Sequence, residues 1–187
     1  WAALDARTQM GGGEIQKIAL ETYRSAVEIM ANDRSRWSPA THETADHSLP
    51  FVIVSALLDG EVTVASFAQS RLNDTGIRAM MQKVDVRESA ACSARYPEAA
   101  PCHLAITMKS GAVIRTEVLY PKGHSKNPLT DAEIDLKFSQ LFRSFGPPEQ
   151  CAAVLAELRR FEAVTDVRQL LGRIGHALAT LKPQQTP

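Results

Sequence analysis

Two short polar segments of the 187-residue chain combine residue types that could move protons or bind anions. The first is THETADHSLP, residues 41–50, which lies directly ahead of the apolar run FVIVSALL. It contains two histidines, His42 and His47, and a free imidazole with a pKa of about 6.5 can give or take a proton at neutral pH. A helix that begins here would also attract anions to its N-terminus. The segment is therefore a candidate reactive cluster at the edge of a core.

The same segment equally suits an ordinary helix start. Thr44, Asp46 or Ser48 could each cap a helix by accepting a backbone N–H, and Pro50 fits a first turn. Capping explains the polar residues but does not explain two nearby histidines. Both interpretations stay open from the residues alone.

The second segment is YPKGHSKNPLTDAE, residues 120–133. Lys122, His124 and Lys126 alternate around Gly123, and a predicted helix start follows directly. Three potential cations beside a helix N-terminus would form a receptor for a carboxylate or a phosphate. The alternative is a solvated turn whose lysines point into water.

The elements that must position these groups are a few strands and several helices. Residues 14–23 follow a GGG break and read as a strand, and the alternating segment 84–89 reads as another. Residues 103–121 form the clearest hairpin, with Gly111 supplying a positive φ in the turn KSGA. Helices are expected over four segments: 45–59, 130–142, 148–162 and 165–178.

Local signals support these helices. Gly60 stands where the first one should end, and Thr130 with Glu133 forms a capping-box pattern. We predict an α+β fold in which three antiparallel strands form a small sheet with helices on one face. The predicted domains are 1–129 for this part and 130–187 for the later helices, whose last residues, 181–187, should be disordered. Apolar faces on these helices need a partner surface that the small sheet does not supply.

Composition excludes several classes of protein. The chain carries 21 Lys and Arg against 21 Asp and Glu, which gives no support for a nucleic-acid surface. Its apolar share of 44% is typical of a folded globular domain, and it has no apolar run long enough to span a membrane. No signal peptide is visible, so we expect the cytoplasm. The chain starts as if inside a helix, and we expect a fragment, a processed chain or one subunit of a split protein.

The sequence indicates no metal site or cofactor. The three cysteines fit no common zinc or iron–sulfur spacing and are expected to be reduced and mostly buried. A zinc site from His42, Glu43 and His47 matches no standard ligand pattern. We therefore expect no cofactor.

The motifs ETADHSLP and ALLDGEVT, followed by YPKGHSKNPLTDAEI and KF, resemble the carboxyl-terminal part of the MmgE/PrpD family. The resemblance runs from EIQKIALETY through TDAEIDLKF, and the last helices match loosely. It is specific for the family and much less so for the substrate. It implies a two-part enzyme in which a large all-helical domain and a smaller α+β lid enclose an active-site cleft.

The resemblance implies that this chain is the lid together with the returning helices of an otherwise absent helical domain. The implied activity is a hydro-lyase of propionate metabolism that dehydrates a hydroxy-tricarboxylate such as 2-methylcitrate, without a cluster. The implied partners are a polycarboxylate substrate and the N-terminal helical domain, or a second polypeptide carrying it. The complete enzyme is expected to be a homodimer that binds neither nucleic acid nor membrane, and this chain alone is expected to be inactive.

Within that scheme, Lys122, His124 and Lys126 are assigned to binding substrate carboxylates. His47 is the candidate acid–base or orienting group, and Asp46 is its partner. Relatives often carry tyrosine where this chain has phenylalanine at position 51, which puts a hydrogen bond from that position in doubt. The alternatives are a decarboxylase or epimerase acting on a related polycarboxylate, and a non-catalytic subunit that binds an acidic metabolite or is purely structural.

Overall fold

A computed structural model describes residues 1–143 and 145–179, with side chains described as far as residue 175. The chain divides into two compact units, the first spanning Trp1–Pro128 and the second beginning at Leu129. The predicted disordered tail at 181–187 lies outside the described residues. No helix in the described part of the chain is long and apolar enough to cross a membrane.

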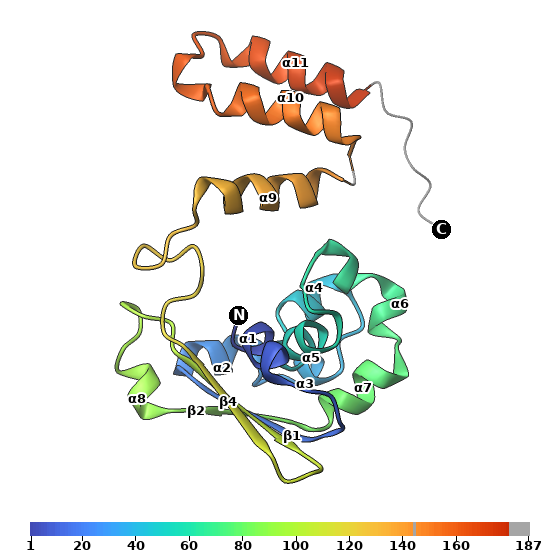
Figure 1. Ribbon diagram of the computed structural model, residues 1–187, viewed down its shortest axis with the longest axis vertical. Coiled ribbons are helices and arrows are strands. Elements are labelled where there is room, and N and C mark those ends of the chain that lie inside the picture. The colour runs from blue at the N-terminus through green and yellow to red at the C-terminus, as the bar shows by residue number, and fades with distance from the viewer. Residues whose placement is uncertain (144, 180–187) are drawn as a thin grey trace. The chain divides into compact units, whose positions relative to one another are not determined.

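The first unit is built on a four-stranded sheet (Figure 1). Its strands are β1 (Ile15–Thr22), β2 (Val84–Glu88), β3 (Cys102–Met108) and β4 (Val113–Val118), in the order β2-β1-β3-β4. The predicted α+β class is confirmed, and β1, β3 and β4 form the expected antiparallel set. The sheet differs in one respect, because β2 adds to β1 in parallel. A parallel neighbour requires a long crossover, and the helices between β1 and β2 provide it.

The hairpin of β3 and β4 has the predicted turn. Gly111 adopts a φ of 87°, a conformation that residues with a side chain rarely adopt. Its N–H donates to the Met108 carbonyl at 2.9 Å, and the Met108 N–H donates to the Ala112 carbonyl at 2.8 Å. The hairpin predicted from the alternation of apolar and polar residues is confirmed.

Helices cover one face of the sheet. The helices of this unit are α1 (Ala2–Gln9), α2 (Arg24–Met30), α3 (Arg34–Trp37), α4 (His42–Asp46), α5 (Leu49–Asp59), the 3-10 helix η1 (Val64–Phe67), α6 (Gln69–Leu72), α7 (Thr75–Met81) and α8 (Ala90–Ser93). Figure 1 shows α1 and α5 stacked on the same side of the sheet. The strands accordingly bury alternate residues: Ile18 and Leu20 of β1 lie in the core, whereas Lys17 and Glu21 are exposed.

The central helix of this core is α5. Its residues Phe51, Val54 and Leu57 are at most 3% exposed. Gly60 ends the helix in the left-handed conformation, as predicted. The guanidinium of Arg7 on α1 donates to the last carbonyls of α5, which joins the two covering helices.

The single helix expected over 45–59 is instead two helices. Helix α4 ends at Asp46, and α5 begins at Leu49. The hydroxyl of Ser48 accepts the N–H of Phe51 at 3.1 Å and donates to the Arg36 carbonyl, so Ser48 caps a new helix. The predicted start was wrong because several residues of this segment could cap a helix, and the structure selects Ser48 for the buried helix.

The second unit contains α9 (Asp131–Phe142), α10 (Pro148–Leu158), the 3-10 helix η2 (Phe161–Ala163) and α11 (Val167–Ala179). The capping box of Thr130 and Glu133 is confirmed. Its buried core is small: Phe142, Cys151 and Val154 form one cluster, and Leu170 is also buried. Several large apolar side chains stay exposed in this unit: Leu136, Phe145, Phe161 and Leu171 are 53–62% exposed. That these helices pack on further protein stays a prediction.

The core role of α5 can be tested with two substitutions in the same helix. Phe51→Ala should lower the free energy of unfolding by about 3–5 kcal/mol, because it removes a buried ring and leaves a cavity. Leu58→Ala, at a position that is 39% exposed, should cost less than half of that. Urea unfolding followed by circular dichroism measures both. Equal losses for the two variants would contradict the packing described here.

Candidate functional site

The segment 41–50 forms the end of one helix and the start of the next, with His47 at the junction. Thr41 caps α4: its hydroxyl accepts the Thr44 N–H at 3.2 Å, and the Thr44 hydroxyl accepts the Thr41 N–H at 3.0 Å. Together with Ser48 at the start of α5, these contacts show that helix capping accounts for the hydroxyl residues of the segment. It does not account for the imidazole and carboxylate groups.

Asp46 and His47 are in direct contact. Nδ1 of His47 lies 2.5 Å from a carboxylate oxygen of Asp46 and 3.1 Å from the Glu43 carbonyl oxygen. The hydrogen bond to Asp46, then the Glu43 carbonyl and the charge of Asp46, raise the pKa of His47 above its usual value. Its Nε2 makes no hydrogen bond or ion pair with any described residue. The pair is thus a carboxylate-oriented imidazole whose second nitrogen is available.

The same turn gathers possible metal ligands. Ligand atoms of Glu43, Asp46 and His47 all lie within 4.8 Å of one another. The other histidine takes no part, because the ring of His42 stacks on Phe67 with centroids 5.1 Å apart. Such a cluster on an accessible helical turn is also common without an ion, and we assign no metal.

Phe51, next along the segment, is a packing residue. It is 1% exposed, and its ring centroid lies 6.0 Å from that of Phe67. With Trp37, Leu72 and Met81 it lines a cavity of about 150 Å³. Phenylalanine therefore fills the core at this position without offering a hydrogen bond.

The loop after β4 is held by its own hydrogen bonds. Gly123 adopts a φ of 94°, and its N–H donates to the Asn127 carbonyl at 2.8 Å. The side-chain amide of Asn127 donates to the Tyr120 carbonyl at 2.8 Å. A glycine is needed at Gly123 because residues with a Cβ rarely adopt that φ. The loop is therefore a defined structure on which cationic side chains are fixed.

Lys126 of this loop already binds a carboxylate. Its ammonium group pairs with Glu98, lies 3.4 Å from the Tyr120 hydroxyl, and sits 5.2 Å from the centroid of the Tyr120 ring. The hydrogen bond to Glu98 is the main cause that raises the pKa of Lys126, and the same contact lowers the pKa of Glu98. Both side chains are accessible, at 47% and 77% exposure, so a competing anion could reach the ammonium group.

The other two predicted cations also have partners in the loop. Nδ1 of His124 accepts the backbone N–H of Lys126 at 3.1 Å, and its ring lies 5.0 Å from that of Tyr120. Nζ of Lys122 is 3.4 Å from the Pro128 carbonyl. The structure thus brings the three predicted residues into one short loop, and none of them is simply a side chain in water.

The two clusters do not meet within the first unit. Figure 1 shows α4 on one side of the unit and the loop after β4 on the other. The described contacts group His47 with Asp46 and Glu43, and they group Lys126 with Tyr120 and Glu98. A cleft that both clusters face stays a prediction.

Sequence reasoning missed two residues of the loop cluster. Tyr120 stood inside the quoted motif, directly ahead of Pro121 and the lysines, and its aromatic ring was the available signal. Glu98 lies in a separate loop before β3, and no local pattern connects it to Lys126. Only the fold brings this carboxylate to the lysine.

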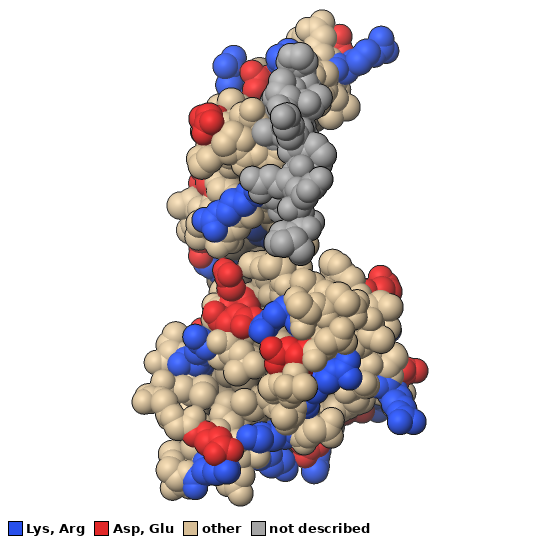
Figure 2. Space-filling model, turned by 90° about the vertical axis from the view of Figure 1, so that its right-hand side faces the viewer, with Lys and Arg blue, Asp and Glu red and all other residues tan. Residues whose placement is uncertain are grey.

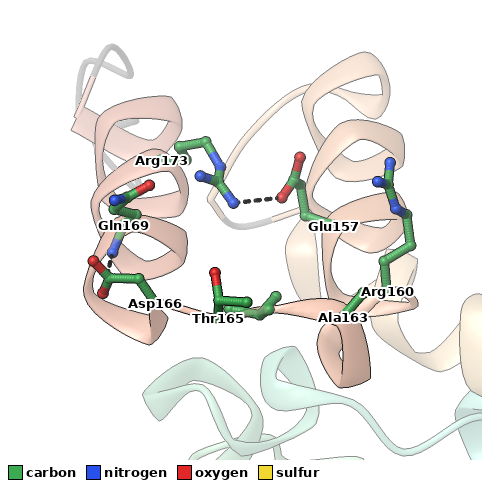
Figure 3. A pocket seen from close by; sticks show the side chains of 8 residues that line it. Glu157, Arg160, Ala163, Thr165, Asp166, Gln169 and Arg173 are labelled. Atoms are coloured by element: carbon green, nitrogen blue, oxygen red, sulfur yellow. Dashed lines mark hydrogen bonds and ion pairs between the residues drawn. The ribbon is translucent and has the colours of Figure 1, made fainter.

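A separate hollow of about 210 Å³ lies between α10 and α11 (Figure 3). Arg173 pairs with Glu157 across it at 2.9 Å, and Asp166 caps the start of α11. The carboxylates of this hollow offset its arginines, so it has no clear preference for an anion. None of the residues predicted from the sequence lines it.

The surface charge is mixed. On the face shown in Figure 2, cationic and anionic side chains are interspersed, and neither sign forms a continuous field. This agrees with the balance of 21 positive and 21 negative side chains in the whole sequence. An anion would therefore be recognised by local groups such as Lys126, not by the field of the whole molecule.

Comparisons with known proteins agree with the motifs. Residues 2–161 match the model of the MmgE/PrpD C-terminal domain. Human cis-aconitate decarboxylase is 30% identical over 108 residues, which cover 54% of this chain and 21% of that protein. The 2-methylcitrate dehydratase of Escherichia coli K12 is 28% identical over 118 residues, covering 60% of this chain and 24% of that protein.

The chain therefore spans about a fifth to a quarter of the length of these relatives. The matched domain, by contrast, extends over most of the chain, from α1 to η2. This chain belongs to the MmgE/PrpD family, whose C-terminal domain it carries over residues 2–161.

Proposed function

We propose that this chain is the lid and C-terminal portion of a lyase that eliminates water from a hydroxy-tricarboxylate such as 2-methylcitrate. Membership of a family with dehydratase and decarboxylase relatives supports a lyase. Elimination of water needs a base for an acidic C–H bond, an acid for the leaving hydroxyl, and cations that hold the substrate carboxylates. This chain contributes candidates for the last two needs.

One observation carries the proposal: Lys126 holds the carboxylate of Glu98. The ammonium group of Lys126 contacts the Tyr120 hydroxyl and ring as well as the Glu98 carboxylate, so Tyr120 helps to position the cation that holds the anionic oxygen. In our proposal a substrate carboxylate replaces that of Glu98, with Lys122 and His124 in the same loop. The Glu98 carboxylate therefore stands in for the substrate group, and binding is an exchange of one ion pair for another.

The Asp46–His47 pair is the proposed acid–base or orienting group. Asp46 fixes the ring through Nδ1 and raises the pKa of His47, which favours the protonated imidazole. A protonated Nε2 could donate to a leaving hydroxyl or hold a carboxylate. The remaining proton-transfer groups would come from the helical domain.

The proposal includes partners. The exposed apolar side chains of α9 to α11 would pack on the N-terminal helical domain, whether it belongs to the same protein or to a second polypeptide. The complete enzyme would be a homodimer. Because the helical domain would supply most proton-transfer groups, the 187-residue chain alone should show no turnover.

A second candidate reaction is decarboxylation of cis-aconitate. The 30% identity to human cis-aconitate decarboxylase supports it, and it would use the same carboxylate receptor. Epimerisation of a related polycarboxylate is a third candidate reaction. A non-catalytic subunit would bind the acid without converting it, and a purely structural subunit would not bind it.

Steady-state kinetics of the complete enzyme, assayed with 2-methylcitrate and with cis-aconitate, test the assignments. Lys126→Ala should raise KM and lower kcat/KM by about ten- to a hundredfold, since it removes a charge-assisted contact made in both ground and transition states. His47→Ala should instead lower kcat by about a hundredfold or more, because it removes a group that transfers or orients a proton.

Lys109→Ala is the matched control, because Lys109 lies on the hairpin turn and pairs with Glu14 outside the loop. Its kinetics should equal those of the parent enzyme. Parent-like kinetics in a folded Lys126→Ala variant would remove this lysine from the site. An unchanged kcat for His47→Ala would leave the segment 41–50 as helix capping alone.

The Asp46–His47 contact also predicts a titration. The pKa of His47 is raised in the folded chain, so its contribution to stability is fully present below the unfolded pKa and is lost as pH rises through the folded value. Asp46→Asn should bring the pKa of His47 down toward the usual value of about 6.5. NMR titration of the imidazole measures both proteins, and equal pKa values in the two would contradict the contact.

A further inference from the structure

A cavity in the first unit combines an apolar floor with a polar mouth. It has a volume of about 150 Å³ and is lined by residues of α3, α5, α6 and α7 and of the turns that follow α3 and α7. Its floor includes Phe51, Leu72 and Met81, each at most 2% exposed. Its mouth carries the exposed residues Arg78 and Gln82. The cavity is therefore open to solvent at a polar rim and apolar beneath it.

The side chains of the floor offer no strong hydrogen-bonding group. Trp37 also lines the cavity, but its indole N–H already donates to the Ala31 carbonyl at 2.6 Å. The ring of Trp37 therefore presents only apolar surface, as do Phe51 and Leu72. An apolar cavity of about 150 Å³ in a folded protein stays dry and is large enough to bind benzene. The floor thus suits a compact apolar group of about that size.

Arg78, at the mouth, is a cation held in place by neutral acceptors. Its Nε donates to the Leu72 carbonyl at 2.9 Å, and its Nη2 donates to the side-chain oxygen of Asn73 at 3.3 Å. A guanidinium group has five N–H donors, so three of them are left, including both on Nη1. Arg78 forms no ion pair with any residue in the described part of the chain.

The acids nearest to Arg78 in this part of the fold have another partner. Asp74, one helical turn earlier on α7, lies 3.7 Å from a guanidinium nitrogen of Arg71. Asp59 lies 2.6 Å from a second nitrogen of the same group. The positive charge of Arg78 is therefore left without a carboxylate, and the planar guanidinium is well suited to bind one.

We propose that this cavity binds a small monocarboxylic acid with a compact apolar body. The body lies on the floor against Phe51, Leu72 and Met81, and the carboxylate accepts hydrogen bonds from the free donors of Arg78. Small-molecule sites commonly have this composition, in which apolar walls bury the ligand and a few polar groups fix its orientation.

The same floor excludes a polycarboxylate. A second carboxylate would lie on apolar side chains without a donor, and burying an unpaired charge is costly. The ligand class therefore differs from that proposed for the loop around Lys126. This cavity does not depend on the proposed reaction.

The test compares three probes on the 187-residue chain, with the ¹³C-labelled methyl group of Met81 followed by NMR. Benzoate has both the apolar ring and the carboxylate, toluene has the ring without the charge, and acetate has the charge without the ring. Benzoate should bind at least tenfold more tightly than toluene or acetate. This comparison needs no variant, so it decides the matter even if a variant does not fold.

Two matched substitutions separate the charge from the cavity. Arg78→Gln should weaken benzoate binding by about tenfold or more, because it removes a charge-assisted contact, and should leave toluene binding unchanged. Arg34→Gln is the control, since Arg34 is exposed on α3 and its side chain has no hydrogen bond or ion pair among the described residues. Arg34→Gln and Lys126→Ala should both bind benzoate like the parent chain.

Four results would overturn the proposal. The Met81 methyl signal does not respond to benzoate, or toluene binds as tightly as benzoate, which would leave an apolar cavity without a role for Arg78. Arg78→Gln binds benzoate as well as Arg34→Gln does. Lys126→Ala loses benzoate binding, which would place the probe at the loop after β4 instead.

Discussion

The packing of α1 and α5 against a single face of the sheet is the constraint on which the rest of the first unit depends. Ile18 and Ile106 are fully buried beneath these helices. Thr116 of β4 donates to the Ala2 carbonyl at 2.8 Å, and Arg7 caps α5, so the helices are tied to each other and to the edge of the sheet. Because only one face is used, His47 at the junction of α4 and α5, the loop after β4 and the second face of the sheet all remain accessible.

In two of these accessible regions, charged side chains are held in defined positions by ion pairs. The junction of α4 and α5 holds His47 against Asp46, and the loop after β4 holds Lys126 against Glu98. An ion pair between exposed groups contributes little to stability, since both charges stay solvated. Such pairs are better suited to exchange, in which one carboxylate replaces another at low cost. The Lys126–Glu98 contact therefore shows where the proposed site would bind a substrate carboxylate.

The parts of the fold that follow local rules could be predicted from the sequence. Gly111 marks a hairpin turn, and Gly60 marks a helix end. The capping box at Thr130 depends on only four consecutive residues. The division between α4 and α5 was missed, because three possible caps lie close together there and only the structure shows that the Ser48 hydroxyl caps a new helix. The parallel pairing of β2 with β1 was missed because the two strands are far apart in the sequence, and no local pattern indicates which strand β2 pairs with.

The candidate site divides in the same way. The three cations of the loop share one motif, so their proximity followed from their spacing. Glu98 could not be found, since it reaches Lys126 from 28 positions away in the sequence. A cleft shared by the loop and His47 was expected from the family resemblance alone, because no local pattern relates the two segments.

The most direct measurement is citrate binding by NMR, following the backbone amides of Gly123, His124 and Lys126. We predict that Glu98→Gln binds citrate more tightly than the parent chain, because the competing carboxylate is gone, and that Lys126→Ala loses the shifts at these amides. Glu61→Gln, an exposed substitution of the same kind away from the loop, should bind like the parent. Equal affinities for the parent chain, Glu98→Gln and Lys126→Ala would contradict the claim that this loop is a carboxylate receptor.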